Sequence, residues 1–375
     1  EAGTMPLKES YVIWNNKGGV GKTTLTFHMA TRYASRNPGV NVLVIDLCPQ
    51  ANVSMALLSS PNHQGSGHLS SLYRENKTIS FYLQSSTEMG PVVDANRFLT
   101  RVSEFNNQVP GNLFLLCGDM YLELIGRHLE HLRAGYAVPR HNPWLIVTTS
   151  IRSFIEGSEG KITGVTQNED ESVEWVVFID TNPAFSVYTE IALAAGNKLI
   201  IPINADDFSI EAVRAMLDLV YDIHPEEEEG AEENFAAYRQ YMFSNKARKF
   251  ELRLPQIHLM INNRVTQKNT RSTTAFEAMG AENLKVLYRA YQQHQRDKMC
   301  FSPHEGEIAD IEAFKRQYFE DVQDFHTTAI LSLHSGCPLQ GLTGKVSLSE
   351  GTKAKVEKRL LPPYLESLDK LVQKL

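Results

Sequence analysis

The chain has 375 residues, of which 42% are hydrophobic and 22% charged, and its formal net charge is −7 at pH 7. These values are ordinary for a water-soluble globular protein, and they exclude a chain that is basic throughout. The four cysteines form no CxxC pair, which argues against a zinc or iron–sulfur site and a disulfide framework and fits a reducing cytosol.

No stretch approaches 18 consecutive apolar residues, and the first ten residues lack the apolar segment of a secretory signal. We therefore expect no transmembrane helix and a cytoplasmic location.

Short apolar runs alternate with helical patterns along the chain. The runs predict strands at 11–14, 41–47, 112–117, 174–180, 197–203 and 256–262. Helices are predicted at 22–36, 120–134, 209–222 and 273–298. Such alternation indicates βαβ units with right-handed crossovers. We expect an α/β fold, a doubly wound and mainly parallel sheet with helices on both faces.

Three polar segments interrupt this alternation, at 60–110, 157–172 and 225–233. The first is rich in Ser, Asn and Gly, and the last is an acidic run that is typical of a solvated turn or linker. We expect all three to be insertions in a single α/β domain at 1–330. A helical C-terminal extension at 331–375 is expected to pack on the same domain.

The segment VIWNNKGGVGKTT at 12–24 has the character of a phosphate-binding loop. Its glycines allow backbone N–H groups to turn toward phosphate oxygens, and the following helix adds its dipole. Lys22 would reach the β- and γ-phosphates, and the Thr23 hydroxyl would be a ligand of Mg²⁺. The strict pattern GxxxxGK[ST] requires glycine where this chain has Asn16. The nucleotide-binding candidates here are Gly18, Gly19, Val20, Gly21, Lys22, Thr23 and Thr24.

The stretch KGGVGKTT resembles the deviant Walker A motif of the ParA/MinD superfamily of ATPases, which has a second lysine at the position of Lys17. The resemblance implies that Lys17 crosses a dimer interface and contacts the nucleotide of the other subunit. Two nucleotides would then be held between the subunits of a homodimer. A second cation near the γ-phosphate would neutralise charge that develops during transfer, so Lys17 and Lys22 are both catalytic candidates.

Further blocks follow in the family's order. The segment at 42–54 is similar to the second strand and switch I (DxDPQ), and 178–186 to the Walker B strand and switch II (DTPP), with Asn182 in place of the first proline. Residues 197–213 and 259–264 are similar to the following family segments. The resemblance implies Mg²⁺ held by Thr23, Asp46 and Asp180, with Asp180 acting through a water.

The adenine would be contacted by Asn262 or Asn263, and we prefer Asn262 because it closes the strand. No NKxD motif for guanine is present, since Asn245-Lys246-Ala247-Arg248 lacks the aspartate. We therefore expect ATP and Mg²⁺ as cofactors.

The second aspartate of DxDPQ is replaced by Cys48. In the family this aspartate positions or activates the attacking water, and a thiol does not hold a fixed negative charge or accept a proton as a carboxylate does. Three interpretations follow. Hydrolysis is slow and the protein is an ATP-gated dimer, Asp46 takes over the role as the catalytic group, or Cys48 is a redox residue.

Residues 236–300 contain twelve Lys/Arg and four Asp/Glu, although the whole chain is acidic. ParA-type relatives bind DNA without sequence preference through basic residues in their C-terminal half, an interaction driven by counterion release. The alternative is that these charges pair with the acidic run at 225–233. The DNA-binding candidates are Lys246, Arg248, Lys249, Arg264, Lys268 and Arg271.

The last twelve residues, YLESLDKLVQKL, form an amphipathic pattern, and MinD-type relatives end in a helix that binds membranes. The polar face here mixes both charge signs, and the segment has no Trp or Phe, so we prefer core or dimer packing to membrane contact.

Together the resemblance implies a ParA-like, Mg-ATP-dependent sandwich-dimer ATPase that binds non-specific DNA in the ATP state and positions or segregates a cargo. A ParB-like or cargo adaptor protein would be its partner, and DNA binding would associate it with the nucleoid. The alternatives are an ATP-gated scaffold with little hydrolysis, because of Cys48, and a MinD-like membrane-cycling regulator.

Overall fold

The computed structural model describes residues 7–60, 64–88, 93–135, 142–157, 162–163, 165, 173–204, 206–224, 242–265, 270–293, 300–349, 352–356 and 358–375. The acidic run at 225–233 lies outside the described residues.

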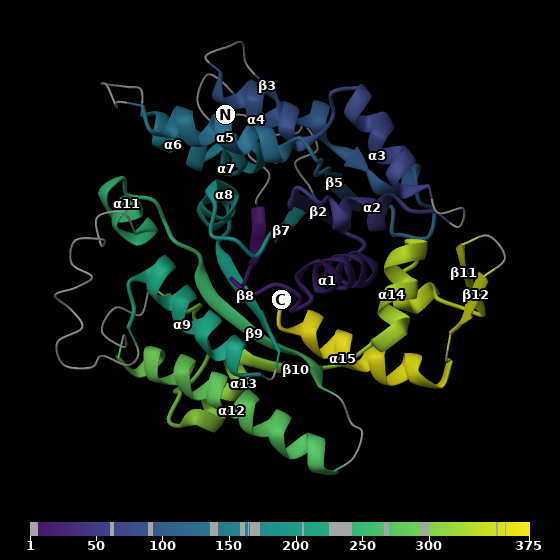
Figure 1. The fold of residues 1–375 in the computed structure, drawn as a ribbon, viewed down its shortest axis with the longest axis vertical. Coiled ribbons are helices and arrows are strands. Elements are labelled where there is room, and N and C mark those ends of the chain that lie inside the picture. Colours follow the sequence, from purple (N-terminus) through teal and green to yellow (C-terminus); the bar gives the residue numbers. More distant parts are fainter. Residues whose placement is uncertain are drawn as a thin grey trace.

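An eight-stranded sheet lies at the centre of the protein (Figure 1). Its strand order is β10-β9-β8-β1-β7-β2-β5-β4, and all neighbours are parallel except β4 and β5, which are antiparallel. The strands are β1 (Leu7–Ile13), β2 (Val40–Leu47), β4 (Thr100–Arg101), β5 (Leu113–Leu116), β7 (Glu174–Thr181), β8 (Lys198–Ile203), β9 (Gln256–Val265) and β10 (Phe319–Gln323). Strand β7 lies between β1 and β2 and is parallel to both. The carboxyl ends of these three strands therefore lie side by side at one edge of the sheet.

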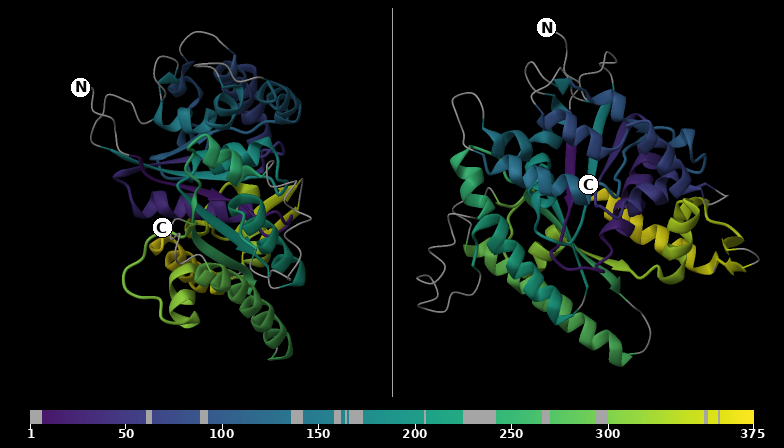
Figure 2. Two further views of the ribbon diagram at one scale, coloured as in Figure 1. Left: turned by 90° about the vertical axis from the view of Figure 1, so that its left-hand side faces the viewer. Right: turned by 45° about the horizontal axis from the view of Figure 1, so that its top comes forward.

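Helices cover both faces of the sheet (Figure 2). One face carries α1 (Lys22–Arg36), α2 (Asn52–Leu58), α14 (His326–Ser335) and α15 (Leu361–Gln373). The other face carries α4 (Ile79–Thr87), α5 (Leu122–Arg133), α6 (Pro143–Thr148), α7 (Ser150–Glu156), α8 (Val187–Ala195), α9 (Asp207–Tyr221), α12 (Thr270–Gln293) and α13 (Ile311–Tyr318). The remaining elements are α3 (Gly65–Arg74), α11 (Phe243–Lys249), the pair β3 (Val93–Asp94) and β6 (Ile162–Thr163), and the hairpin β11 (Lys345–Ser349) and β12 (Thr352–Lys355).

Strand β1 shows why these apolar runs form a sheet buried on both sides. Tyr11 and Ile13 pack against the α1 and α15 face, whereas Val12 and Trp14 pack against the α8 face, and all four are fully buried. Successive side chains point to opposite faces of a strand. A continuous apolar run is therefore what a strand with helices on both sides requires, and the predicted fold class is confirmed.

Most element boundaries differ from the predicted ones by a few residues. β1 begins at Leu7 rather than at residue 11, and β9 continues to Val265. β10 was not predicted, because its sequence FEDVQ contains only two apolar residues, Phe319 and Val322. It pairs in parallel with β9.

The segment at 60–110, expected to be an insertion, contains α3, α4 and the short edge strand β4. Ile79, Tyr82 and Leu83 of α4 are fully buried in the same apolar cluster as β2 and β7. Its short apolar stretches are therefore the inward faces of helices, which pack on the main core rather than forming a separate unit.

The C-terminal part of the chain contains α14, the β11–β12 hairpin and α15, and the expected boundary at residue 330 falls inside α14. The apolar face of α15, with Tyr364, Leu368 and Leu371, is buried against the α1 side of the sheet. Asp369 on its other side accepts hydrogen bonds from Arg32 at 2.7 Å. Among the helices of the described residues, none is long and apolar enough to cross a membrane.

Candidate nucleotide site

The loop between β1 and α1 has the backbone of a phosphate-binding turn. Gly19 and Gly21 have φ angles of +74° and +87°, in the left-handed region that favours glycine. A Cβ atom on Gly21 would lie 2.2 Å from Nδ2 of Asn263, so a larger residue would displace that side chain. α1 begins directly after the turn, which leaves its first backbone N–H groups at the loop.

Lys22 is buried at the start of α1, with 7% of its surface exposed. Its Nζ donates hydrogen bonds to the carbonyl oxygens of Asn15 at 3.1 Å and Lys17 at 2.9 Å. Burial lowers the pKa of Lys22 to about 8, against the opposing effect of the nearby Asp180 carboxylate. The loop thus holds a partly desolvated ammonium group, which strengthens its attraction for an incoming phosphate.

Lys17 points away from this position, toward α9. Its Nζ forms an ion pair with Asp206, the N-cap residue of α9, and donates to Oγ of Ser209 at 3.3 Å. Burial tends to raise the pKa of Asp206, but the bonds from Lys17 and Ser209 outweigh it and leave the pKa below its usual value. The neighbouring Phe208 is 76% exposed, and its ring centre lies 5.8 Å from Nζ of Lys17.

Asp46 and Asp180 are register partners at the carboxyl ends of β2 and β7, and both are fully buried. Asp180 accepts hydrogen bonds from the hydroxyls of Thr23 at 2.8 Å and Thr26 at 3.3 Å. Asp46 accepts bonds from the backbone N–H of Ser54 at 3.0 Å and from its hydroxyl at 2.7 Å.

Burial raises the pKa of both carboxyls, and for Asp180 the nearby Asp46 raises it further. Two buried carboxylates and the Thr23 hydroxyl form a set of hard oxygen ligands, the kind that Mg²⁺ prefers. A divalent cation would stabilise their ionised forms. The residues predicted from the sequence to hold Mg²⁺ therefore fit that ion in donor type and placement.

Cys48 is buried, and its backbone N–H donates to the carboxylate of Asp46 at 3.1 Å. Burial, with the Asp46 charge, raises the pKa of its thiol to about 12. A thiol in this state is neither a general base nor a reactive thiolate near pH 7. The redox interpretation of Cys48 therefore finds no support in its surroundings.

The two candidate adenine residues face different neighbours. Asn262 donates from Nδ2 to Oδ1 of Asp321 on β10 at 2.8 Å, whereas Asn263 donates to the carbonyl oxygen of Val20 in the phosphate loop at 3.0 Å. Asn263 is thus the residue that touches the loop, although the sequence analysis preferred Asn262.

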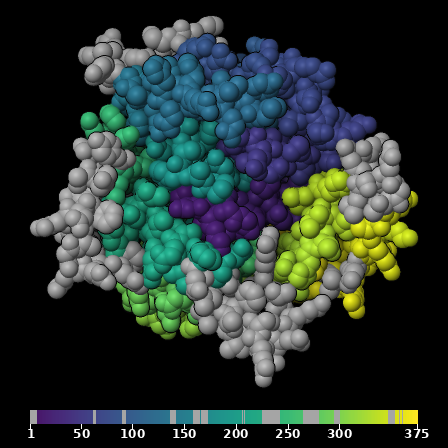
Figure 3. All heavy atoms as spheres, in the orientation of Figure 1, coloured from purple at the N-terminus to yellow at the C-terminus, as the bar shows by residue number. Residues whose placement is uncertain are grey.

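A cavity of about 410 Å³ opens beside the loop, and α14 forms its opposite wall. Figure 3 shows the N-terminal residues at the centre of this face, between the teal α8–α9 region and the yellow-green α14. The cavity is lined by Gly21, Thr24, Asn263, Asp324, Phe325, His326, Ala329, Ile330 and Leu333. Sequence reasoning missed α14, because no family motif marks residues 300–375.

Two other site residues were missed: Gly118, which could have been found from its position after β5, and Ser54 of α2. Gly118 follows β5, at the same edge of the sheet as Asp46, and a Cβ on it would lie 2.8 Å from Cγ of Asp46. Its N–H donates to Oγ of Ser54 at 2.9 Å, which supports the hydroxyl that bonds Asp46.

The candidate DNA-binding residues fall into two groups. Lys246, Arg248 and Lys249 lie on α11, before β9, whereas Arg264 lies near the carboxyl end of β9 and Arg271 follows in α12 (Figure 1). Lys268 lies outside the described residues. The ten-residue strand β9 runs between the two groups, a length of roughly 30 Å at 3.3 Å per residue. The two groups therefore lie at opposite ends of this strand.

Of the cations on α11, Lys246 contacts another helix, whereas Arg248 and Lys249 contact residues of α11 itself or directly after it. Lys246 lies 5.9 Å from the ring centre of Trp144, and Lys249 lies 5.4 Å from that of Phe250. Arg248 donates to Oδ1 of Asn245 at 3.1 Å.

Comparisons with known proteins agree with this geometry. A family described as "AAA domain" matches residues 9–118 and 167–231. An uncharacterized protein of Methanocaldococcus jannaschii is 26% identical over 211 residues, covering 56% of this chain and 64% of the relative. The chain spans 46% to 64% of the length of the curated relatives that it matches.

Solved structures with the same fold include an ATP complex of a variant of Cyanothece McdA. It is 15% identical with a TM-score of 0.50, and the match covers 98% of this chain and 97% of that one. A putative plasmid partition protein of Borrelia burgdorferi bound to AMPPNP is 16% identical with a TM-score of 0.50, covering 98% and 99%. Residues 9–118 and 167–231 thus match a family of AAA domains, and the chain has the fold of these two solved structures.

Proposed function

We propose that the protein is a ParA-like ATPase that closes into a Mg-ATP-dependent sandwich dimer, binds non-specific DNA in that state and positions a cargo. The observation that carries the proposal is the opposite orientation of the two lysines. Lys22 is held at its own loop, whereas Lys17 is held away from it by Asp206. ATP as the ligand is supported by the fold shared with the ATP and AMPPNP complexes.

Each group at the loop has a distinct task in this proposal. The backbone N–H groups from Gly18 to Gly21 and the Lys22 ammonium bind phosphate oxygens, and Asn263 is the residue placed to meet the nucleotide beside Gly21. Thr23, Asp46 and Asp180 would hold Mg²⁺, which neutralises phosphate charge when it is bound.

Lys17 would act on the nucleotide of the second subunit after it leaves Asp206. The side chains of this pair are 20% and 39% exposed, and a partly exposed ion pair contributes only about 1 kcal/mol. A triphosphate carries more negative charge than one carboxylate and is therefore a competitive partner for the ammonium. The pair would thus limit dimerisation without preventing it.

The test compares Lys17→Ala with Lys22→Met in light scattering of the purified protein with ATP, ADP or no nucleotide. Wild-type protein is expected to dimerise with ATP alone. Lys17→Ala should bind ATP in calorimetry but stay monomeric, whereas Lys22→Met should lose ATP binding itself. Asp206→Asn should dimerise at lower protein concentration, because it frees Lys17. An ATP-dependent dimer of Lys17→Ala with unchanged affinity would contradict the proposal.

The proposed DNA binding and cargo role rest on the resemblance to ParA-type proteins and on the basic residues of 236–300. Arg264 lies near the carboxyl end of β9, at the nucleotide edge, and Lys268 and Arg271 follow this strand in the sequence. The charges of these three residues would therefore respond to dimerisation more directly than those of α11. The check is fluorescence anisotropy with a duplex of random sequence. ATP-dependent, salt-sensitive binding is expected, with a loss in the triple Gln variant of these residues and a smaller loss for Lys246, Arg248 and Lys249. Equal binding of the duplex with ADP and with ATP would refute the proposal that DNA binding depends on the ATP state.

A second candidate function is an ATP-gated scaffold with little hydrolysis, favoured by the buried, protonated Cys48. Cys48→Asp would restore a carboxylate at this position, and we expect turnover to rise roughly a hundredfold, the lower end of the range for a general base. Steady-state phosphate release, with Cys48→Ser as the matched control, measures this. Fast turnover in the wild-type protein would exclude the scaffold function.

Membrane cycling through the C-terminal helix is not proposed. The apolar face that would enter a lipid surface is packed in the core, with Leu368 and Leu371 buried.

A further inference from the structure

The β11–β12 hairpin has one apolar face and one basic face. Val346, Ala354 and the following Val356 pack against Leu331 of α14 in a small apolar cluster. Lys345 stands opposite Lys355 across the hairpin, and the next position along β12 on that face is Lys353. Because neighbouring residues in a strand alternate between faces, these lysines lie on the side that faces away from the cluster.

Because Lys345 stands directly opposite Lys355, two positive charges repel each other in the isolated protein. Like charges directly opposite each other in an antiparallel pair destabilise a sheet. Lys345, Lys353, Lys355 and Lys358, here called the hairpin lysines, are all exposed. Among the described residues, no ion pair reaches any of them, in contrast to exposed lysines such as Lys8 and Lys285, which pair with Glu174 and Glu282. An anionic partner would remove the repulsion.

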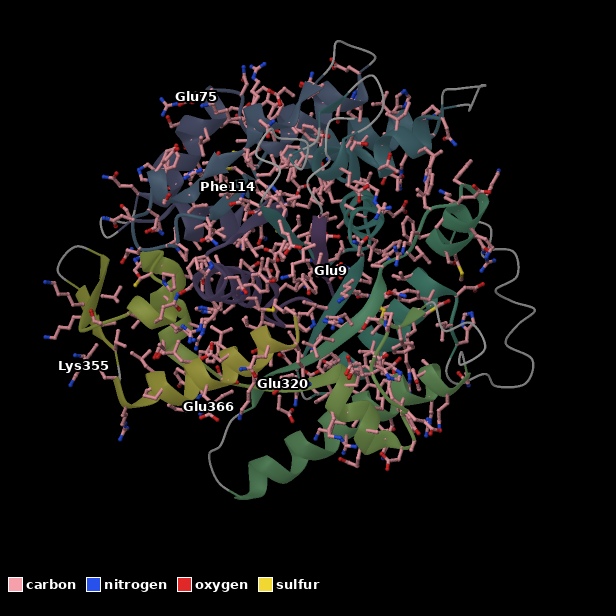
Figure 4. All side chains as sticks on the ribbon, turned by 180° about the vertical axis from the view of Figure 1, so that it is seen from behind. Glu9, Glu75, Phe114, Glu320, Lys355 and Glu366 are labelled. Atoms are coloured by element: carbon pink, nitrogen blue, oxygen red, sulfur yellow. The ribbon has the colours of Figure 1, made fainter. Side chains whose placement is uncertain are left out.

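A hollow of about 670 Å³ lies between the hairpin and the turn that leads into α15. Lys345, Lys355, Lys358 and Arg359 are four of its six lining residues, with Gly344 and Val356. Figure 4 shows Lys355 at the outer edge of the molecule, with its side chain directed away from the body. The hollow is open, basic and large enough for the sugar–phosphate groups of a nucleic acid strand.

We propose that the hairpin lysines bind the phosphate backbone of DNA, at a site separate from the basic residues of 236–300. A membrane surface is less favoured, because such a site combines cations with bulky apolar anchors. The large exposed apolar side chains of the described residues are Met120, Tyr121, Leu124, Phe208 and Ile330, none of which lies on the hairpin. The chain carries net negative charge, so a local group of cations without described partners is what would hold DNA against that background.

Helix α14 connects this surface to the nucleotide cavity. Ile330 and Leu333 line the cavity beside Gly21 and Thr24, whereas Leu331 packs against the hairpin. A nucleotide that shifts α14 would move the hairpin with it. The coupling to ATP, but not the DNA contact itself, rests on the function proposed above.

The experiment measures duplex binding by fluorescence anisotropy from 50 to 300 mM salt, with and without ATP, using the full chain. The test variant is Lys345→Gln, Lys353→Gln, Lys355→Gln. The control variant, Lys8→Gln, Lys77→Gln, Lys285→Gln, removes the same charge from lysines that are paired with carboxylates. Because the substituted lysines of the hairpin are exposed and repel each other, the test variant should unfold at the same temperature as wild type or slightly higher.

Loss of three phosphate contacts should weaken binding at least tenfold at 50 mM salt and reduce the slope of log K against log salt by roughly 2 to 3. The control variant should retain wild-type binding. If the test variant binds DNA as tightly as wild type in the ATP state, the hairpin proposal is wrong while the proposed function stands. If wild type binds no DNA, both fail. Vesicles of phosphatidylserine and phosphatidylcholine form a further arm, and binding to them in place of DNA would overturn the proposal.

Discussion

The two ends of helix α1 lie in very different surroundings. At its first turn, Lys22 is buried and Thr23 is partly buried among polar groups, and the nearby Asp180 and Asp46 carboxyls lie in a site whose burial disfavours their charge. Toward its last turns, the helix is covered by α14 and α15, and its arginines bond the carboxylate of Asp369. One helix thus joins a site that is costly for folding to a region that stabilises the fold.

This difference teaches how the protein can hold an unfavourable group of charges in place. The desolvated lysine and carboxyls oppose folding, because burial penalises their ionised forms. The apolar contacts of α15 along the same helix favour folding. We therefore expect substitutions at the first end to change ligand binding without loss of stability, and substitutions further along to do the reverse.

The largest effect is expected for Lys22→Met, which keeps the length of the side chain and removes its charge. ATP affinity should fall at least a hundredfold, about 2.7 kcal/mol, because in the proposed function the cation would bond directly to phosphate oxygens. The free energy of unfolding should stay the same or rise, since burial already lowers the pKa of Lys22 to about 8. Calorimetric titration with ATP and urea unfolding measure the two quantities. A large drop in stability with ATP binding retained would contradict the assignment of ligand binding to the first end of α1.

His28, further along α1, should produce a pH-dependent loss of stability. It is fully buried between Phe27 and Phe325, at ring-centre distances of 5.2 and 5.5 Å, and its ring nitrogens have no hydrogen-bond partner among the described residues. Burial lowers the pKa of His28 to about 3. The unfolded chain, with a histidine pKa near 6.5, binds the proton more readily, so its contribution to stability is full above pH 6.5 and falls as pH decreases toward 3.

The loss from this group at pH 5 is about 2 kcal/mol. His28→Leu should remove that part of the pH dependence, as measured by urea unfolding at pH 7.5 and pH 5. The exposed His128 of α5, changed to Gln, is the control and should leave the pH dependence as in wild type. An identical pH dependence in His28→Leu and wild type would show that this histidine is not held neutral by its surroundings.

The nucleotide end of α1 could be read from the sequence, and the covered part could not. Lys17, Lys22 and Thr23 belong to one contiguous loop, and the strand ends at Asp46 and Asp180 follow from the rule that parallel strands share an edge. The ion pair between Arg32 and Asp369 joins residues 337 positions apart, which no local pattern reveals. The same holds for Asp206, whose contact with Lys17 depends on how β8 lies beside β1.

The smallest of these effects is expected for Asp369→Asn on α15, which tests the covered part of α1 directly. The hydrogen bonds from Arg32 come first among the causes that hold the pKa of Asp369 at about 2. The contribution of the ionised Asp369 to the free energy of unfolding is therefore present above pH 4 and is lost as pH falls through 2. The side chains of Arg32 and Asp369 are 11% and 23% exposed, and solvent screening limits the loss at pH 7 to about 1 kcal/mol. Thermal unfolding at pH 7 measures it, with the exposed Glu366→Gln on the same helix as the control. ATP affinity should be unchanged, because Asp369 touches α1 three turns from Lys22. A loss of ATP binding equal to that of stability would mean that the two ends of α1 respond as one unit, and the division between binding and stability along this helix would be wrong.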